Sequence, residues 1–114
     1  MHLETQALGE GLLVHVHAER IDAASAIQFK DRMREIAQGA EGRVVLDMGG
    51  VDFIDSSGLG AIVAALKAMP EGKRLELADL QPKVVKVFRL TRMDSVFVIH
   101  DSVEAVRASD MDAA

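Results

Sequence analysis

The chain of 114 residues has no cysteine, tryptophan or tyrosine, and aromatic residues make up only 4% of it. Without cysteine it can form neither a disulfide nor a thiolate metal site, as is usual for a protein of the cytoplasm. So few aromatic residues also predict a core built from aliphatic side chains. No apolar run reaches the length of about 18 residues that a membrane-spanning helix needs, and no signal peptide is visible. We therefore expect a cytoplasmic protein that does not associate with membranes.

Positive charge is also scarce, since 13 Lys and Arg stand against 18 Asp and Glu and give a net charge of −5. Nucleic-acid binding requires a basic patch for phosphate contacts, so we expect no nucleic-acid partner. The length corresponds to one domain with one core. We expect that domain to cover residues 1–108, to be monomeric, and to be followed by a short flexible tail at 109–114.

The apolar pattern predicts alternating strands and helices, and hence an α/β fold. Apolar and polar residues alternate in the strand candidates, whereas the helix candidates repeat their apolar residues every three or four positions. The predicted strands are 3–8, 12–18, 43–48, 73–78 and 96–99. The predicted helices are 23–38, one that starts just after Asp55 or Ser56 and runs to about 69, 82–90, and a closing helix that ends at about residue 108.

One stretch, residues 51–63, organises the chain. It begins as an apolar, strand-like run, turns through Asp-Ser-Ser-Gly and continues with helical spacing. We expect Asp55 or Ser56 to cap the helix, because a short side-chain oxygen can accept a bond from an unpaired N–H of the first turn. The large apolar residues of the helix would form its buried face, and its small residues a flat outer face. The large residues are Leu59, Ile62, Val63, Leu66 and Met69, and the outer residues are Gly60, Ala61, Ala64, Ala65, Lys67 and Ala68.

Two glycines, Gly58 and Gly60, lie in the first turn of this predicted helix. Each glycine inside a helix costs roughly 1 kcal/mol relative to alanine. Two of them together indicate that something approaches the backbone closely there. The group that approaches could belong either to a neighbouring strand or to another protein.

The segment Ile54-Asp55-Ser56-Ser57-Gly58-Leu59-Gly60 resembles the phosphorylation loop of the STAS family, and specifically of the bacterial anti-sigma-factor antagonists. The resemblance implies a mixed, mainly parallel sheet of about five strands packed against about four helices. It also implies that Ser56 is the phospho-acceptor, with Ser57 as second choice. In this family an Asp in the turn before the first helix contacts the partner kinase, and the matching residue is Asp22, which could also cap the helix that follows it.

The same resemblance implies the partners. Unphosphorylated protein would bind an anti-sigma factor that is an ATP-dependent serine kinase, and a metal-dependent serine phosphatase would reverse the modification. ATP and magnesium would lie in the kinase, so no cofactor is expected in this chain, and it would not be an enzyme. An alternative is a STAS scaffold subunit of a lipid-transport or stress-sensing assembly. The expected binding surface consists of Asp22, Asp55, Ser56, Ser57, Gly58, Leu59 and Gly60.

Two kinds of metal site are conceivable. His15 and His17 lie two residues apart on one face of a predicted strand, but no third ligand or acidic partner stands at a useful spacing, so the solvent face of the strand is the preferred interpretation. Asp47, Asp52 and Asp55 follow a predicted strand and could gather into a magnesium site.

Two catalytic alternatives lack sequence support. A serine esterase would require the G-x-S-x-G elbow, which is absent around Ser56. A phospho-accepting aspartate domain, like a response-regulator receiver, would place an acidic pair after its first strand, where Gly9-Glu10-Gly11 stands instead.

Overall fold

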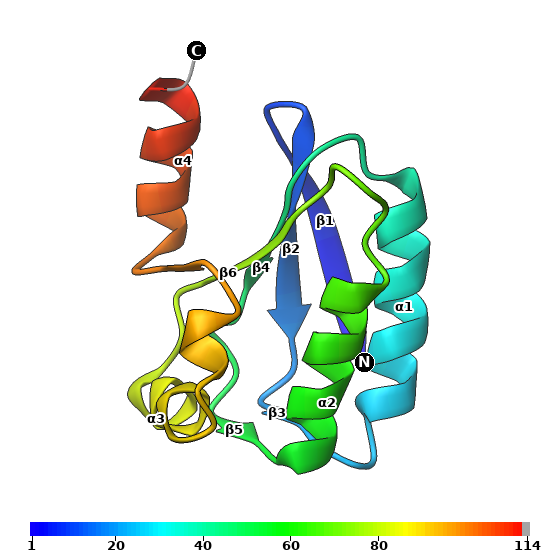
Figure 1. Cartoon of the computed structure of the whole chain (residues 1–114), viewed down its shortest axis with the longest axis vertical. Coiled ribbons are helices and arrows are strands. Elements are labelled where there is room, and N and C mark those ends of the chain that lie inside the picture. The colour runs from blue at the N-terminus through cyan, green and yellow to red at the C-terminus, as the bar shows by residue number, and fades with distance from the viewer. Residues whose placement is uncertain (113–114) are drawn as a thin grey trace.

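The structure is a computed structural model that describes residues 1–112. Five strands form one sheet in the order β1-β2-β4-β6-β7 (Figure 1). Strand β1 is antiparallel to β2, and the other neighbours are parallel. The predicted mixed, mainly parallel sheet is confirmed. The strands are β1 (His2–Leu8), β2 (Gly11–His17), β4 (Val44–Asp47), β6 (Leu75–Ala78) and β7 (Ile99–His100).

Four helices accompany the sheet, as expected. Helices α1 and α2 pack side by side, and α4 stands on the opposite side of the sheet from them (Figure 1). None of these helices, in the described part of the chain, is long and apolar enough to cross a membrane. The helices are α1 (Ala26–Gly39), α2 (Ser56–Lys67), α3 (Pro82–Leu90) and α4 (Val103–Asp112), with a single 3-10 turn, η1 (Met93–Ser95).

Helix α4 does not end at about residue 108 as predicted, but continues to Asp112. Four of the six residues expected to form a tail are therefore helical. The remaining two, 113–114, lie outside the described residues.

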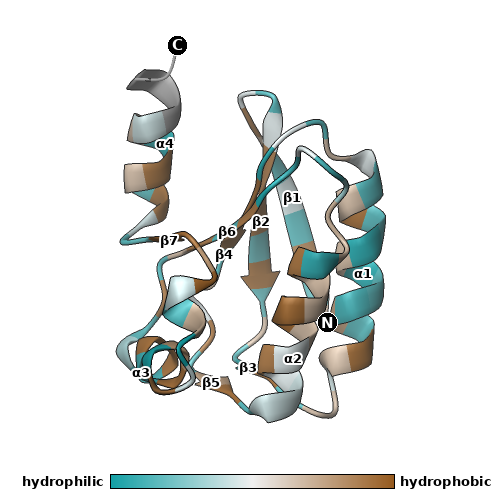
Figure 2. Ribbon diagram, in the orientation of Figure 1, coloured by the Kyte–Doolittle hydropathy of each residue, from teal (hydrophilic) through white to brown (hydrophobic). Residues whose placement is uncertain are grey.

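The main core lies between the sheet and α1, α2 and α3. Aliphatic residues of the central strands supply most of it, and this part of the ribbon is strongly hydrophobic (Figure 2). The composition predicted a purely aliphatic core, but the core also contains aromatic side chains. Phe29 and Phe88 are fully buried, and Phe97 meets Phe88 edge to face with ring centroids 5.9 Å apart. Three of the four phenylalanines in the chain thus lie in the core.

A smaller apolar cluster lies on the other face of the sheet, under α4. Val103 and Val106 of α4 pack there against strand residues Leu8, Leu13 and Val45. The rest of this face is polar and carries all four histidines, because His2, His15, His17 and His100 alternate with residues that face the main core.

A carboxylate is buried on this face as well. Glu76 of β6 is only 3% exposed. It accepts a hydrogen bond from Nε2 of His100 at 2.8 Å and lies between Arg43 and Arg74, whose nitrogens are 3.7 and 3.5 Å from its oxygens. The two arginines and the hydrogen bond from His100 offset the cost of burying a charge there.

Two short strands add to the five predicted ones, and the second of them lies in the strand-like run that opens residues 51–63. Strands β3 (Arg20–Ile21) and β5 (Phe53–Ile54) pair in parallel, with Ile21 opposite Ile54. A further difference concerns the last strand, predicted at 96–99, which is found at Ile99–His100 because the backbone N–H groups of Val96 and Phe97 bond back to the carbonyl oxygen of Met93 in η1. Two-residue strands are too short to show a period of two, so only their partner defines them.

Helix α2 approaches the core with its small residues. The predicted flat outer face is wrong in part, since Ala61 and Ala65 are buried together with Gly58 and Ile62. Small side chains allow the helix to lie close to its neighbours α1, β3 and β5, and the larger residues then pack along its flanks. The half-buried flanking residues are Leu59, Val63, Leu66 and Met69.

Candidate functional site

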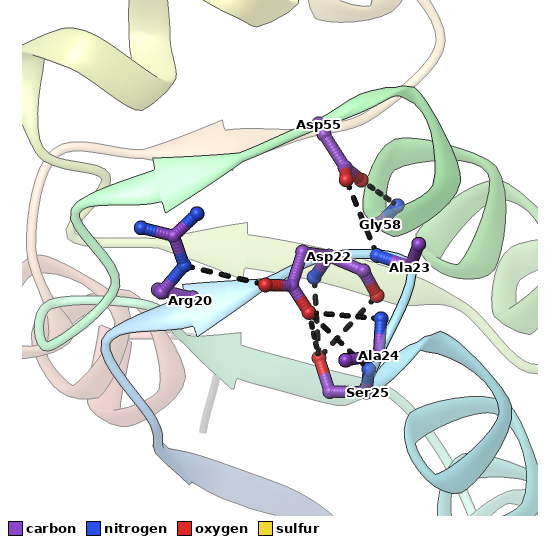
Figure 3. A network of polar contacts seen from close by, with 7 residues as sticks. All are labelled: Arg20, Asp22, Ala23, Ala24, Ser25, Asp55 and Gly58. Atoms are coloured by element: carbon purple, nitrogen blue, oxygen red, sulfur yellow. Dashed lines mark hydrogen bonds and ion pairs between the residues drawn. The ribbon is translucent and has the colours of Figure 1, made fainter.

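The residues of the predicted site gather at one end of the molecule. Strand β5 leads into α2, and the strand that pairs with it, β3, leads into the turn before α1. The parallel pairing therefore places two loops, 22–25 and 55–58, next to each other (Figure 3).

Asp55 joins these two loops through its side chain. One carboxylate oxygen accepts a hydrogen bond from the backbone N–H of Gly58 at 2.8 Å, which caps α2 as predicted. The other oxygen accepts one from the backbone N–H of Ala23 at 3.2 Å (Figure 3). This second bond crosses from one loop to the other, and the sequence held no signal for it because the pairing of β3 with β5 creates it.

Gly58 fits because it has no side chain. A Cβ at this position would overlap the carbonyl oxygen of Ile21 in β3 and lie 2.6 Å from its carbonyl carbon. The same carbonyl oxygen accepts a bond from the backbone N–H of Asp55 at 3.4 Å. The sequence left open whether a strand or another protein approaches these glycines. At Gly58 it is the strand β3.

Asp22 closes the turn before α1 rather than capping the helix. Helix α1 begins at Ala26, three residues later than the predicted start, with Ser25 in the N-cap position. An oxygen of Asp22 accepts bonds from the backbone N–H groups of Ala24 and Ser25 at 3.1 and 3.3 Å. These bonds within the turn leave Asp22 outside the helix that it was expected to begin.

Arg20 holds the other oxygen of Asp22. Its Nε donates to Oδ2 at 3.2 Å, and its guanidinium carbon lies 4.1 Å from the centre of the Phe53 ring. The bond from Arg20, followed by those from Ser25 and Ala24, lowers the pKa of the Asp22 carboxyl below its ordinary value of 3.8. Asp22 thus stays ionised and fixed in orientation at neutral pH. Sequence reasoning missed Arg20, because an exposed arginine before a turn has no distinctive pattern.

Ser56 and Ser57 are the first two residues of α2, and both are exposed. In the described part of the chain, neither hydroxyl takes part in a hydrogen bond within the protein. The histidines offer no base to Ser56, since His15, His17 and His100 bond to Glu4, Gln6, Asp47 and Glu76, and His2 stacks on His17. The arrangement presents two free hydroxyls at the positive end of a helix dipole, where a negative charge is stabilised.

Leu59 and Gly60 complete the first turn of α2. Leu59 is half-buried and packs on the core, whereas Gly60 is exposed and a Cβ there would have no neighbour within 4 Å. The internal contacts that explain Gly58 therefore do not explain Gly60. The expected binding residues thus lie in the turn before α1 and at the start of α2, with Gly58 itself buried, and their role in binding remains a prediction.

The acidic residues near the site do not form a metal cluster. Asp47 accepts bonds from Nδ1 of His15 at 2.7 Å and from the backbone N–H of Gly49 at 3.0 Å, while Asp55 caps α2. Among the described residues, no group of three or more His, Asp or Glu has a metal-binding arrangement. His15 was expected to lack an acidic partner, yet β4 supplies Asp47, and β1 supplies Glu4 to His17 at 2.8 Å.

Comparisons with known proteins agree with this geometry. The chain is 31% identical over 101 residues to BtrV of Bordetella bronchiseptica, a protein named as an anti-sigma factor antagonist, covering 88% of this chain and 87% of BtrV. It is 32% identical over 84 residues to the anti-sigma-B factor antagonist of Listeria monocytogenes, covering 72% and 73% of the two chains. A STAS-domain anti-sigma-factor antagonist from Planctomyces limnophilus has the same fold, with a TM-score of 0.85, 19% identity, and coverage of 96% and 97%. Finally, the model of the STAS domain family matches residues 2–106. The chain therefore belongs to the STAS domain family.

Proposed function

We propose that this protein is an anti-sigma-factor antagonist whose binding is switched by phosphorylation of Ser56. In the unphosphorylated form it binds an anti-sigma factor that is also a serine kinase, and the sigma factor is released. The kinase transfers the γ-phosphoryl group of ATP to the Ser56 hydroxyl, which releases its proton to a base of the kinase, and ADP leaves. A metal-dependent phosphatase restores the serine.

The observation that carries this proposal is the state of Ser56. Its hydroxyl is exposed and makes no internal hydrogen bond among the described residues, although its backbone is fixed between the Asp55 cap and the contact of Gly58 with β3. A kinase can reach such a hydroxyl without unfolding the domain. The names of the two curated relatives support an anti-sigma factor as the partner.

The position of Ser56 also explains how a phosphate would act. It would add a charge of about −1.5 to −2. The helix dipole stabilises a nearby anion by roughly 0.3–1 kcal/mol, so the fold should persist. Asp55, which directly precedes Ser56, would repel the phosphate. Binding of a partner surface that removes water from this end of the molecule would then cost free energy. Modification should therefore prevent binding locally.

The test uses the purified protein, ATP, magnesium and the serine-kinase anti-sigma factor of the same cell, with native mass spectrometry and phosphopeptide mapping. We expect one phosphate per chain on Ser56 and loss of the complex with the kinase. The Ser56→Ala variant should bind without being modified. Ser57→Ala is the matched control, because it removes an equally exposed hydroxyl from the same turn and should leave phosphorylation intact.

Other outcomes would change the proposal in defined ways. Phosphate on Ser57 alone would move the acceptor by one residue. Stable binding of wild type without any phosphate would contradict the switch and favour the scaffold alternative. The absence of both binding and phosphate with this kinase would contradict the proposed partner.

A further inference from the structure

Helix α3 carries charge of one sign on an otherwise acidic protein. Residues 82–92 contain four cationic side chains and no acidic residue, whereas the whole chain has a net charge of −5. All four are exposed, and none forms an ion pair among the side chains that the structure describes. The four are Lys83, Lys86, Arg89 and Arg92.

An apolar floor accompanies these cations. Leu80, Pro82 and Val85 line an open hollow of about 450 Å³, and Lys86 and Arg89 form its remaining wall. Leu90, which is 75% exposed, lies one helical turn beyond Lys86 on the same face. Aliphatic and cationic groups therefore alternate along a surface that no other part of the described chain covers.

A second hollow adjoins the first. It has a volume of about 330 Å³ and shares Val85 and Arg89 with the first hollow, but Asp94 and Asp101 line it as well. Because of the two carboxylates, this second hollow carries charges of both signs. The consistently cationic part of the surface is therefore the first hollow and the outer face of α3.

The place of α3 in the fold relates this surface to the site. Its buried residues, Val84 and Phe88, anchor it in the main core. Helix α3 also packs against β5, the strand that leads into Asp55 and Ser56, at the same end of the molecule (Figure 1). A protein that covers Ser56 could therefore extend onto α3.

We propose that the outer face of α3 is a docking surface for an acidic, aliphatic segment of a partner protein. Carboxylates of such a segment would pair with Lys86, Arg89 and Lys83, and its aliphatic side chains would cover Leu80, Val85 and Leu90. Charge complementarity favours this occupant, because an interface places opposite potentials face to face. The proposal does not depend on modification of Ser56.

Two other anionic occupants fit less well. A single-stranded nucleic acid is bound largely by stacking of its bases, and the hollow offers no aromatic side chain on which a base could stack. An anionic membrane favours clusters of about four to eight Lys and Arg, and this surface, with four, stands at the lower end of that range and breaks its charge with aliphatic side chains.

The experiment titrates the isotope-labelled full chain with a capped peptide of alternating Glu and Leu, and follows amide chemical shifts by NMR. We expect shifts concentrated in residues 80–92 that diminish at high salt. Reversing two charges, in the variant Lys86→Glu/Arg89→Glu, should weaken binding by at least about tenfold, which corresponds to about 1.4 kcal/mol.

A matched control reverses two cations elsewhere. Lys30 and Arg34 are exposed on α1, are four residues apart, and make no ion pair among the described side chains, so Lys30→Glu/Arg34→Glu changes the net charge equally. This control should keep the affinity for the peptide. An equal loss in the control would reveal non-specific attraction and overturn the proposal.

Three further results would also overturn it. One is the absence of peptide-induced shifts on α3. Another is equal binding of a peptide of alternating Glu and Ser, which would remove the role of the aliphatic floor. The third is tighter α3-dependent binding of a single-stranded oligonucleotide or of anionic lipid vesicles than of the peptide. Thermal unfolding of each variant checks that the fold is retained.

Discussion

At the scale of single residues, the two glycines of the first turn of α2 have opposite surroundings. A Cβ on Gly58 would overlap the backbone of β3, whereas one on Gly60 would meet nothing. The first glycine is required by the fold, and the second is tolerated despite its cost to the helix. Only a contact outside the chain gives Gly60 a positive role.

The fold requirement at Gly58 predicts a large loss of stability for Gly58→Ala. The added methyl must displace the backbone of β3 or of α2, and overpacking of this kind costs typically about 1–3 kcal/mol. Urea denaturation followed by circular dichroism measures the free energy of unfolding. A value equal to that of wild type would show that the two segments can separate without cost.

Gly60→Ala is the matched substitution two residues away, with opposite expected effects. Removing a helical glycine should raise the free energy of unfolding by up to about 1 kcal/mol. Binding to the kinase anti-sigma factor should nevertheless weaken, since the methyl group protrudes from the expected contact surface. Calorimetric titration measures this affinity, and unchanged affinity would remove Gly60 from the binding surface.

The lowered pKa of Asp22 predicts that the stability of the fold falls at acidic pH. Because Arg20 lowers the pKa of Asp22 in the folded state below 3.8, its contribution to stability is complete above that pH and is lost as the pH falls through the lower folded value. Arg20→Gln should therefore move the pKa of Asp22 up towards 3.8. Carboxyl-carbon NMR titration measures it, with Arg32→Gln on α1 as control. No difference between the two variants would refute the role of Arg20.

At the scale of elements, the sequence pattern predicted those helices and strands that are long enough to show a repeat of apolar residues. The four helices and the main strands come from apolar repeats of many residues, and the Asp55 cap comes from a side chain next to its own helix. The pairing of β3 with β5 and the Ala23–Asp55 bond depend on residues about 30 positions apart. No local pattern records such contacts. The turn at Asp22 was misread as a cap for another reason, because in both arrangements a short acidic side chain accepts bonds from N–H groups two and three residues later.

The buried face of α2 shows a second limit of sequence patterns. Of the large apolar side chains that were taken to mark the buried face, Ile62 is fully buried and the others are half-buried, while Ala61 and Ala65 are buried as well. How closely a helix approaches its neighbours is a property of the assembled fold. The same holds for Glu76, whose alternation with Leu75 and Leu77 gave no sign that it would be buried between Arg43 and His100.

Helix α4 is held to the sheet by few buried side chains, which predicts local sensitivity. Val106 is its one fully buried residue among those whose side chains are described. Val106→Ala should cost about 1–3 kcal/mol of stability in α4, from lost burial and the cavity left behind. Hydrogen exchange should accelerate in α4 and remain unchanged in α1. Ala105→Ser, at an exposed position, is the control, and equal acceleration in both helices would contradict a local effect.

At the scale of the whole molecule, the exposed side chain of Ser56 is energetically separate from the bulk of the fold. Ser56 is exposed at one end and contributes no contact to either core cluster. We therefore expect Ser56→Asp to keep the free energy of unfolding within about 1 kcal/mol of wild type, because the helix dipole favours the new charge. Binding to the kinase should be lost in the same variant. Unfolding by Ser56→Asp would contradict this separation.

The way in which Ser56 is held has a consequence for cells that contain several proteins of this kind. Its place is determined by the Asp55 cap and by the glycine contact with β3, while the residues exposed around it make few internal contacts. Surface residues such as Lys86 and Gly60 can therefore diverge between gene duplicates without displacing the hydroxyl. Each duplicate could then acquire its own kinase, and parallel signalling routes could stay insulated while sharing one phosphorylation chemistry.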